Sequence, residues 1–291
     1  MKNQTFGIEI EMNRISRAKA AATIAAHFGT SVDYVGRGRV YDTREVRDQQ
    51  GRIWKVVSDS SIDGPSDEKT ELVSPICRWE DIETVQELVR KLRAAGARPD
   101  PSCGIHVHIG LGAHTPKTLR NLSNLVAAKE ELLIDSLKVS NDRLGHYTKR
   151  TDPRFIQLLN QRRPTSMEAF ARLWYRDDDW QSHACVHYDD SRYRILNLHS
   201  VWQKGTIEFR LFNSTLHAGE IKTYIQLAMA ISHQALESNS ASPRQTPTDN
   251  PKYTFRCWLL RLGFIGPEFA TAREHLLKNL KGDAAFRHGR P

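Results

Sequence analysis

The stretch from Phe6 to Met12 alternates strictly between apolar side chains and small or acidic ones. This period of two predicts a β-strand with two chemically different faces. One face carries Phe6, Ile8, Ile10 and Met12, and the other carries Gly7, Glu9 and Glu11. At a strand rise of about 3.3 Å per residue, the two carboxylates stand roughly 7 Å apart. They repel one another unless water or a cation intervenes, so the strand presents either a solvated acidic face or part of a cation site.

Later segments repeat this alternation with the same kinds of side chain. His106 and His108 share one face of a strand predicted over 104–110, and Glu208 and Arg210 share one face of a strand predicted over 205–212. Glu71 stands at the start of a short extended segment that Pro75 ends. An antiparallel sheet commonly has one wet face, but such a face would be rich in Lys, Thr, Ser and Gln. Glu, His, Arg and Asn instead favour a face that binds divalent cations and polyphosphates.

Helical spacing of apolar residues fills the intervals between these strands. Ser16 is a capping residue for a helix that ends near Phe28, and Gly29 occupies the usual left-handed stop. Thr115 followed by Pro116 predicts the start of a long helix. The remaining predicted helices span 79–95, 153–159, 167–175, 218–236, 253–262 and 267–280, with strands over 52–57, 71–75 and 193–198 and a hairpin-like segment over 32–40.

Composition narrows the class of protein. The 291 residues are 39% hydrophobic, which is enough to bury a sizeable core. No apolar run reaches the length of a membrane span and no apolar signal region precedes the first strand, so we expect a cytoplasmic protein that does not enter a membrane. The four scattered cysteines predict neither disulfides nor a thiolate zinc cluster. A formal charge of +8 favours anionic partners, although the dispersed arginines do not by themselves indicate nucleic acid.

The acidic and basic residues of the alternating strands suggest a division of labour. Glu9, Glu11, Glu71 and Glu208 with one histidine would make a hard, oxygen-rich site, suited to Mg²⁺ or Mn²⁺ that also holds phosphates. Arg210 and Arg194 would neutralise a phosphoryl group in transfer. Neither a phosphate-binding loop of the Gly-x-x-x-x-Gly-Lys-Ser/Thr type nor a kinase motif set occurs, so a nucleotide must be held in another way.

Five motifs in series resemble the amidoligase family, which belongs to the carboxylate–amine ligase superfamily of glutamine synthetase and glutamate–cysteine ligase. In chain order they are Phe-Gly-Ile-Glu-Ile-Glu at 6–11, Asp59-Ser60-Ser61-Ile62, Glu71-Leu72-Val73-Ser74-Pro75, Cys103-Gly104-Ile105-His106-Val107-His108 and Ile207-Glu208-Phe209-Arg210. The resemblance extends from residue 6 to about residue 236.

This resemblance implies an α+β fold like that of glutamine synthetase, with a curved, mostly antiparallel sheet and helices packed on its convex face. The concave face would hold two or three Mg²⁺ or Mn²⁺ ions between ATP and a carboxylate substrate. By the same resemblance the metal ligands are Glu9, Glu11, Glu71, His106 and Glu208. Arg210 would bind phosphate and act in catalysis, and Arg194 would be a second such arginine.

The resemblance also implies roles for three further residues. Asp59 lies where a contact to the substrate amine or to a metal is expected, so it is a candidate catalytic residue. His108 would face the nucleotide or the substrate, and Asn197 would lie beside the nucleotide. The implied reaction moves the γ-phosphoryl group of ATP to a carboxylate, and an amine then attacks the acyl phosphate to form an amide. Because that intermediate must be kept from water, we expect a lid from 141–163 or 177–191.

The domain organisation follows from the motifs and from a change in composition. We expect a catalytic domain over 1–237, a linker or mobile loop over 238–252 that is rich in Ser, Pro, Thr and Asn, and a helical extension over 253–291 packed on the same domain. The substrates would be a carboxylate and an amine, either of them a small molecule, a peptide or a protein tail. The sequence does not identify them and does not fix the oligomeric state.

Two alternative functions remain open from the residues. A zinc-dependent hydrolase could use His106 and His108 with one of His183, Cys185 or His187. That reading leaves the glutamates and Arg210 unexplained. A non-enzymatic protein that binds nucleic acid or phosphate could use the arginine-rich middle of the chain, and steep salt dependence of nucleic-acid affinity would reveal it.

Overall fold

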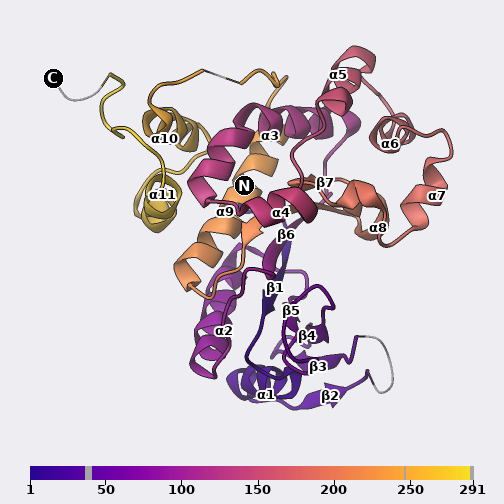
Figure 1. Ribbon diagram of the computed structural model, residues 1–291, viewed down its shortest axis with the longest axis vertical. Helices are drawn as coiled ribbons and strands as arrows, with labels where there is room; N and C mark the ends of the chain where they lie inside the picture. The colour runs from indigo at the N-terminus through magenta and orange to yellow at the C-terminus, as the bar shows by residue number, and fades with distance from the viewer. Residues whose placement is uncertain (37–40, 246, 289–291) are drawn as a thin grey trace. The chain divides into compact units, whose positions relative to one another are not determined.

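The computed structural model describes residues 1–36, 41–245 and 247–288, and within them the chain forms two compact units (Figure 1). The first unit comprises Lys2–His108 and Phe212–Ile225. The second unit comprises Met1, Ile109–Leu211 and Gln226–Pro291. The predicted division into a catalytic domain, a linker and an extension stays a prediction. Among the described residues, no helix combines the length and apolar character needed to cross a membrane.

A sheet forms the centre of the first unit, with strands in the order β2-β3-β4-β5-β1-β6. The pairs β2/β3, β3/β4, β4/β5 and β5/β1 are antiparallel. The strands are β1 (Phe6–Met12), β2 (Val32–Tyr34), β3 (Arg44–Arg47), β4 (Ile53–Ser58), β5 (Thr70–Val73) and β6 (Gly104–Gly110). The helices of this unit are α1 (Arg17–Phe28), η1 (Trp79–Asp81) and α2 (Ile82–Ala94).

The sequence predicted both ends of helix α1 closely. The Ser16 side chain accepts a hydrogen bond from the Lys19 N–H at 3.2 Å, and Gly29 ends the helix with φ 66°. Its buried residues, Ile24 and Phe28 among them, pack against β3 and β4. The segment after β8 belongs to this unit as well, because the Ser214 hydroxyl donates to the carbonyl oxygen of Glu11 at 2.8 Å.

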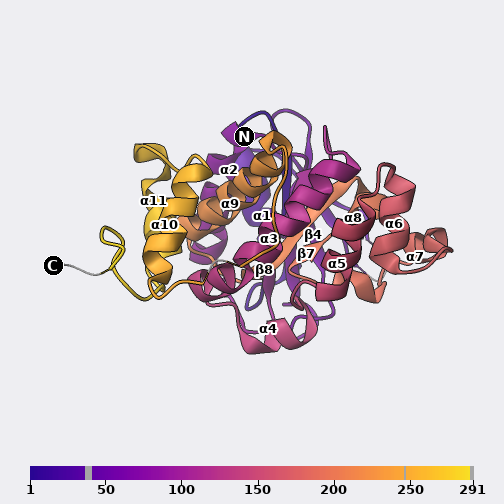
Figure 2. The same cartoon turned by 90° about the horizontal axis from the view of Figure 1, so that it is seen from above.

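Helices dominate the second unit. They are α3 (Pro116–Leu137), α4 (Asn141–His146), α5 (Pro153–Arg162), α6 (Met167–Tyr175), α7 (Trp180–Cys185), η2 (Asp190–Arg192), α8 (Ser200–Lys204), α10 (Pro251–Arg261), η3 (Pro267–Phe269) and α11 (Ala270–Leu277), with the second half of α9 (Ala218–Glu237). Strand β7 (Leu196–Asn197) pairs antiparallel with β8 (Thr206–Asn213). Figure 2 shows α10 and α11 beside one another, and the Asn279 side chain ties the chain after α11 to the Ser136 carbonyl of α3 at 2.8 Å.

The α+β class and the antiparallel strand pairing are confirmed, but two local predictions need comment. The strand predicted over 193–198 is wrong in extent, since regular pairing with β8 covers only Leu196 and Asn197. Its first half instead binds the chain near Lys149, with Lys149 N donating to the Tyr193 carbonyl at 2.9 Å and Ile195 N donating to the Lys149 carbonyl at 2.9 Å. The hairpin-like segment predicted over 32–40 lies partly outside the described residues, and β2 is the part described.

Candidate active site

The register of the first unit's sheet brings its glutamates together. Strands β1 and β5 pair so that Glu11 stands directly opposite Glu71, and Glu9 lies two residues along β1 on the same face. Ligand atoms of Glu9, Glu71 and His106 all lie within 4.8 Å of one another. Those of Glu11, Asp59 and Glu71 satisfy the same limit. Glu71 belongs to both groups, so five predicted site residues form one continuous cluster.

Burial decides between a solvated acidic face and a binding face. The apolar side of β1 is inaccessible to solvent, as predicted. The acidic side is almost equally closed, with Glu11 4%, Glu71 9% and His106 5% exposed. Charged groups are rarely buried in this way unless they are paired or coordinate a metal, because transfer out of water is costly. The face is therefore buried rather than a wet surface, and it is the candidate site.

Imidazole groups lie against the carboxylates in this cluster. His106 Nδ1 is 3.1 Å from a carboxylate oxygen of Glu9, and His106 Nε2 is 3.8 Å from one of Glu11. His108 Nε2 lies 3.3 Å from the other oxygen of Glu9. The backbone N–H of Gly104 donates to Glu11 at 2.5 Å, which fixes that carboxylate beside β6.

Asp59 reaches the same cluster from the loop after β4. One of its carboxylate oxygens accepts hydrogen bonds from both the backbone N–H and the hydroxyl of Ser61, each at 2.7 Å. An aspartate that accepts a hydrogen bond from the backbone two residues later forms a local turn, and here the turn fixes the position of the Asp59 carboxylate. Asp59 is thus oriented toward Glu11 and Glu71 by its own loop.

The donor set of this cluster fits a divalent cation. Four carboxylates and one imidazole with ligand atoms this close provide the hard, mostly oxygen environment that Mg²⁺ and Mn²⁺ prefer. A bound cation would also relieve the repulsion among buried carboxylates. Ligand atoms within 4.8 Å of one another are close enough to share one ion, since typical Mg–O distances are about 2.1 Å.

A second polar group forms in the second unit around Glu208. The β7/β8 register places Asn197 opposite Glu208, and the Asn197 amide donates to one carboxylate oxygen at 2.6 Å. Arg210 Nη1 donates to the other oxygen at 2.6 Å. All three side chains are buried, and among the described residues no hydrogen-bond partner reaches Asn197 Oδ1. An orphaned buried acceptor beside a glutamate is a place where a further ligand group would be stabilised.

Arg210 is held by residues that the sequence pattern did not reveal. Arg143, which is buried in α4, donates from Nη2 to the Arg210 carbonyl at 2.9 Å. Arg210 Nε donates to the Tyr147 carbonyl at 3.4 Å, and its guanidinium carbon lies 5.8 Å from the centre of the Tyr193 ring. Strand alternation could not find Arg143 or Tyr147, because both lie in the irregular basic segment that was considered only as a lid.

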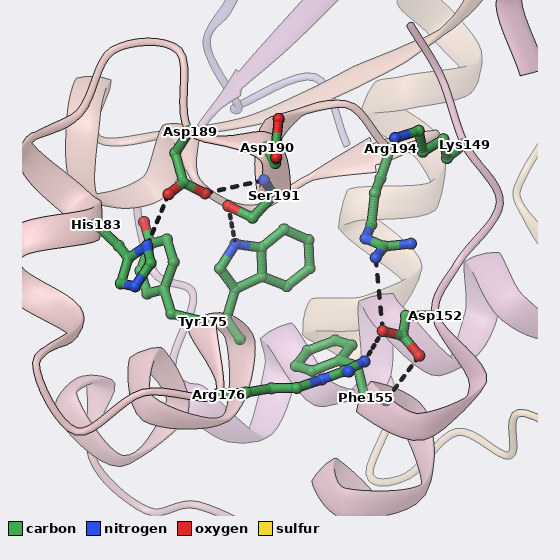
Figure 3. A pocket seen from close by; sticks show the side chains of 11 residues that line it. Lys149, Asp152, Phe155, Tyr175, Arg176, His183, Asp189, Asp190, Ser191 and Arg194 are labelled. Atoms are coloured by element: carbon green, nitrogen blue, oxygen red, sulfur yellow. Dashed lines mark hydrogen bonds and ion pairs between the residues drawn. The ribbon is translucent and has the colours of Figure 1, made fainter. Parts of the chain in front are cut away.

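Arg194 lines a pocket of the same unit (Figure 3). Its Nη2 lies 3.5 Å from Asp152, and its Nη1 donates to the Arg150 carbonyl at 2.9 Å. Burial lowers the pKa of this guanidinium, and the nearby charge of Arg176 lowers it further. The structure thus joins Arg210, Glu208 and Asn197, and it directs Arg194 to a neighbouring pocket.

The histidines of the zinc alternative have other partners. His183 Nδ1 is 2.8 Å from Asp189 and its Nε2 is 3.2 Å from Asp177. The hydrogen bond to Asp189, followed by that to Asp177, raises the pKa of His183. Throughout the described ranges, no group of potential metal ligands includes His183, Cys185 or His187.

Comparison with known families identifies the chain at this point. Residues 2–232 match the family model described as "Putative amidoligase enzyme". The chain belongs to this family. As an amidoligase it is a ligase that forms a carbon–nitrogen bond, and the resemblance drawn from the five motifs is confirmed. The matched range contains every predicted site residue, from Glu9 to Arg210.

Other comparisons are more distant. None of the curated proteins matches the chain. Among solved structures, the chain is similar to the crystal structure of the complex between the prokaryotic ubiquitin-like protein Pup and its ligase PafA, with 10% identity and a TM-score of 0.32. The match covers 97% of this chain and 51% of that one, so the chain spans about half the length of the solved structure.

Proposed function

We propose that this amidoligase is an ATP-dependent carboxylate–amine ligase that activates its carboxylate substrate as an acyl phosphate. The observation that carries the proposal is the cluster of half-buried Glu9 with buried Glu71 and His106, whose ligand atoms lie within 4.8 Å of one another. Buried carboxylates at this spacing favour divalent cations, and a ligase that uses ATP needs such cations to handle phosphate charge.

In the first unit, we propose that Glu9, Glu11, Glu71 and His106 hold Mg²⁺ or Mn²⁺. When bound, the cation would polarise the phosphate oxygens and neutralise their charge. The protein's contribution is to fix the ligands in advance. Gly104 N–H holds Glu11, and the strand register holds Glu71 opposite it. The role of Asp59 is a contact to the substrate amine or to a cation, and that of His108 is a contact to the nucleotide or substrate.

In the second unit, we propose that Glu208 is a cation ligand and that Arg210 binds a transferring phosphoryl group. Arg210 is buried and oriented by Tyr147 and by Glu208, so it can present a positive charge without rearranging. A charge fixed in advance in a water-poor site stabilises a transition state more effectively than a mobile one. Asn197 would offer its free amide oxygen to the nucleotide or to a group bound with it.

The amide forms when an amine attacks the acyl phosphate. The carbonyl carbon gains a C–N bond as its bond to the phosphate oxygen breaks, inorganic phosphate leaves, and the amine loses a proton. His108 and Asp59 are the groups of the first unit that we propose could receive this proton or orient the amine. The substrates are a carboxylate and an amine. Each could be a small molecule, a peptide or a protein tail.

The direct test is a screen for ADP release with ATP and Mg²⁺ or Mn²⁺ against a matrix of carboxylates and amines. We expect ADP formation that requires both a carboxylate and an amine and that is lost in Glu71→Gln. Glu80→Gln, which removes a carboxylate from an exposed position in η1, is the matched control. ADP release that needs no acceptor amine, or that survives Glu71→Gln unchanged, would contradict the ligase mechanism.

A further inference from the structure

A pocket of about 370 Å³ lies in the second unit, apart from the Glu208–Arg210 pair (Figure 3). Its volume falls within the range of pockets that bind small organic molecules, about 300–1,000 Å³. Part of its lining comes from the two segments predicted as lids, with Lys149, Asp152 and Phe155 from the first and Asp189 and Ser191 from the second. The rest comes from the end of α6, with Trp174, Tyr175 and Arg176, and from Arg194. The segments therefore line a defined cavity between them.

One wall of this pocket gathers more positive charge than its carboxylate can compensate. Asp152 caps helix α5, accepting from the backbone N–H groups of Arg154 at 2.9 Å and Phe155 at 3.4 Å. The same carboxylate pairs with Arg176 and lies 3.5 Å from Arg194. A single negative charge thus faces two guanidinium groups and a helix N-terminus, which itself favours anions.

Lys149 adds a third cation to this wall. Its backbone is bonded to the Arg194 segment, because Ile195 N donates to the Lys149 carbonyl at 2.9 Å. Figure 3 shows Lys149, Arg194 and Asp152 on one side of the pocket and His183 with Asp189 on the other. Burial lowers the pKa of Arg194, and the neighbouring charge of Arg176 lowers it further.

Two aromatic side chains, Trp174 and Phe155, also line the pocket. Trp174 donates from Nε1 to the Ser191 hydroxyl at 3.1 Å, and its ring meets Phe155 edge to face at 5.0 Å. Asp189 is bonded to His183 and to the Ser191 N–H. Asp190 also lines the pocket, and solvent and salt screen its charge as they screen that of Lys149, because both side chains are exposed.

The pocket adjoins the phosphate-binding arginine through a single strand segment. The Tyr193 ring lies 5.8 Å from the guanidinium of Arg210, and the next residue, Arg194, enters the pocket. Arg210 N also donates to the carbonyl of Ile195 at 2.9 Å. A molecule in the pocket is therefore held by the same backbone segment that abuts Arg210.

We propose that this pocket, which we call the cationic pocket, binds a non-reacting anionic group of a substrate, a carboxylate or a phosphate carried on a flat apolar body. Arg194 and Lys149 contact the anion, and Trp174 and Phe155 contact the body. That the bound molecule is a ligase substrate rests on the proposed function, whereas binding itself does not. The pocket would thus select among substrates by a charge remote from the reacting groups.

Isothermal titration of the full chain without ATP or metal tests binding directly. The probes are phenylacetate and phenyl phosphate, with phenethylammonium as the matched cation. We expect one or both anions to bind and phenethylammonium not to bind; preference between the anions distinguishes a carboxylate from a phosphate ligand. Since a hydrogen bond to a charged group contributes about 1.5–3 kcal/mol, Arg194→Gln and Lys149→Gln should each weaken binding by roughly tenfold or more.

The controls separate this proposal from the proposed function. Arg162→Gln removes an exposed positive charge from the same unit outside the pocket and should leave anion affinity unchanged. Glu71→Gln should abolish ADP formation yet leave anion affinity unchanged. The proposal is overturned if neither anion binds, if phenethylammonium binds as well as they do, or if affinity is unaltered in Lys149→Gln, whose exposed side chain can be replaced without harm to folding.

Discussion

Replacing Glu71 by Gln should have opposite effects on the protein with and without divalent cation. Glu71 belongs to two clusters of potential metal ligands. One contains Glu9 and the other contains Glu11 and Asp59, and within each cluster the ligand atoms lie within 4.8 Å of one another. Two unit charges 4.8 Å apart repel by about 3.5 kcal/mol at an effective dielectric constant of about 20. The neutral amide removes this repulsion and keeps the shape of the side chain. We therefore expect the metal-free variant to be more stable than the metal-free native protein, by roughly 1–3 kcal/mol after loss of hydrogen bonds to the charged form.

With a divalent cation bound, the native protein should instead be more stable than the Glu71→Gln variant. A ligand that binds only the folded state at 100 times its dissociation constant stabilises it by about 2.7 kcal/mol, and Glu71→Gln should lose most of that gain. The assay is thermal unfolding followed by circular dichroism in EDTA and in a MnCl₂ titration, with Glu80→Gln as the exposed control. If the variant unfolds at lower temperature in EDTA and still gains the full native shift with Mn²⁺, the cation-site reasoning is refuted.

Three other predictions concern both units. Glu208→Gln and Arg210→Ala should each abolish amine-dependent ADP formation. Arg210→Ala should also lower the free energy of unfolding by about 3–5 kcal/mol, because it leaves a buried carboxylate uncompensated. Turnover near the native rate in both variants would contradict the ligase mechanism. Ser16→Ala should lower unfolding stability by about 1 kcal/mol through loss of the α1 cap, as measured by urea titration. Burial lowers the pKa of His114 to about 4, so stability should decline by about 3 kcal/mol as pH falls from about 6.5 to 4, and His114→Gln should flatten that dependence.

Alternation along single strands was enough to predict which side chains share a face in the first unit's candidate site. Glu9 and Glu11 were placed on one face by period alone, and the two histidines of β6 by the same rule. Helix α1 was equally accessible, because Ser16 and Gly29 act through local backbone chemistry. These features depend on neighbours within a few residues, which a single sequence displays.

Features set by contacts between distant segments escaped prediction. The bond between Asn197 and Glu208 depends on strand register, and Arg143 supports Arg210 from 67 residues away. The strand expected over 193–198 was overruled by pairing with the chain at Lys149, a competition that propensity does not report. Arg194 consequently lies near Asp152, although it was expected to neutralise the transferring phosphoryl group together with Arg210.

The two faces of β1 make different contributions, since the apolar face stabilises the fold and the acidic face carries the candidate ligands. Ile8 and Ile10 bury their side chains completely and contribute the hydrophobic free energy that holds the strand, whereas taking the carboxylates of Glu9 and Glu11 out of water costs free energy. A face that costs stability persists in a folded protein only if the rest of the fold supports it, and here the support is the rigid apolar side of the same strand. The carboxylates are thereby held close together before any ligand arrives. Because the side chains are already in position, little free energy is needed to order them when a ligand binds. Charged groups fixed in advance in this way are the ones that serve catalysis.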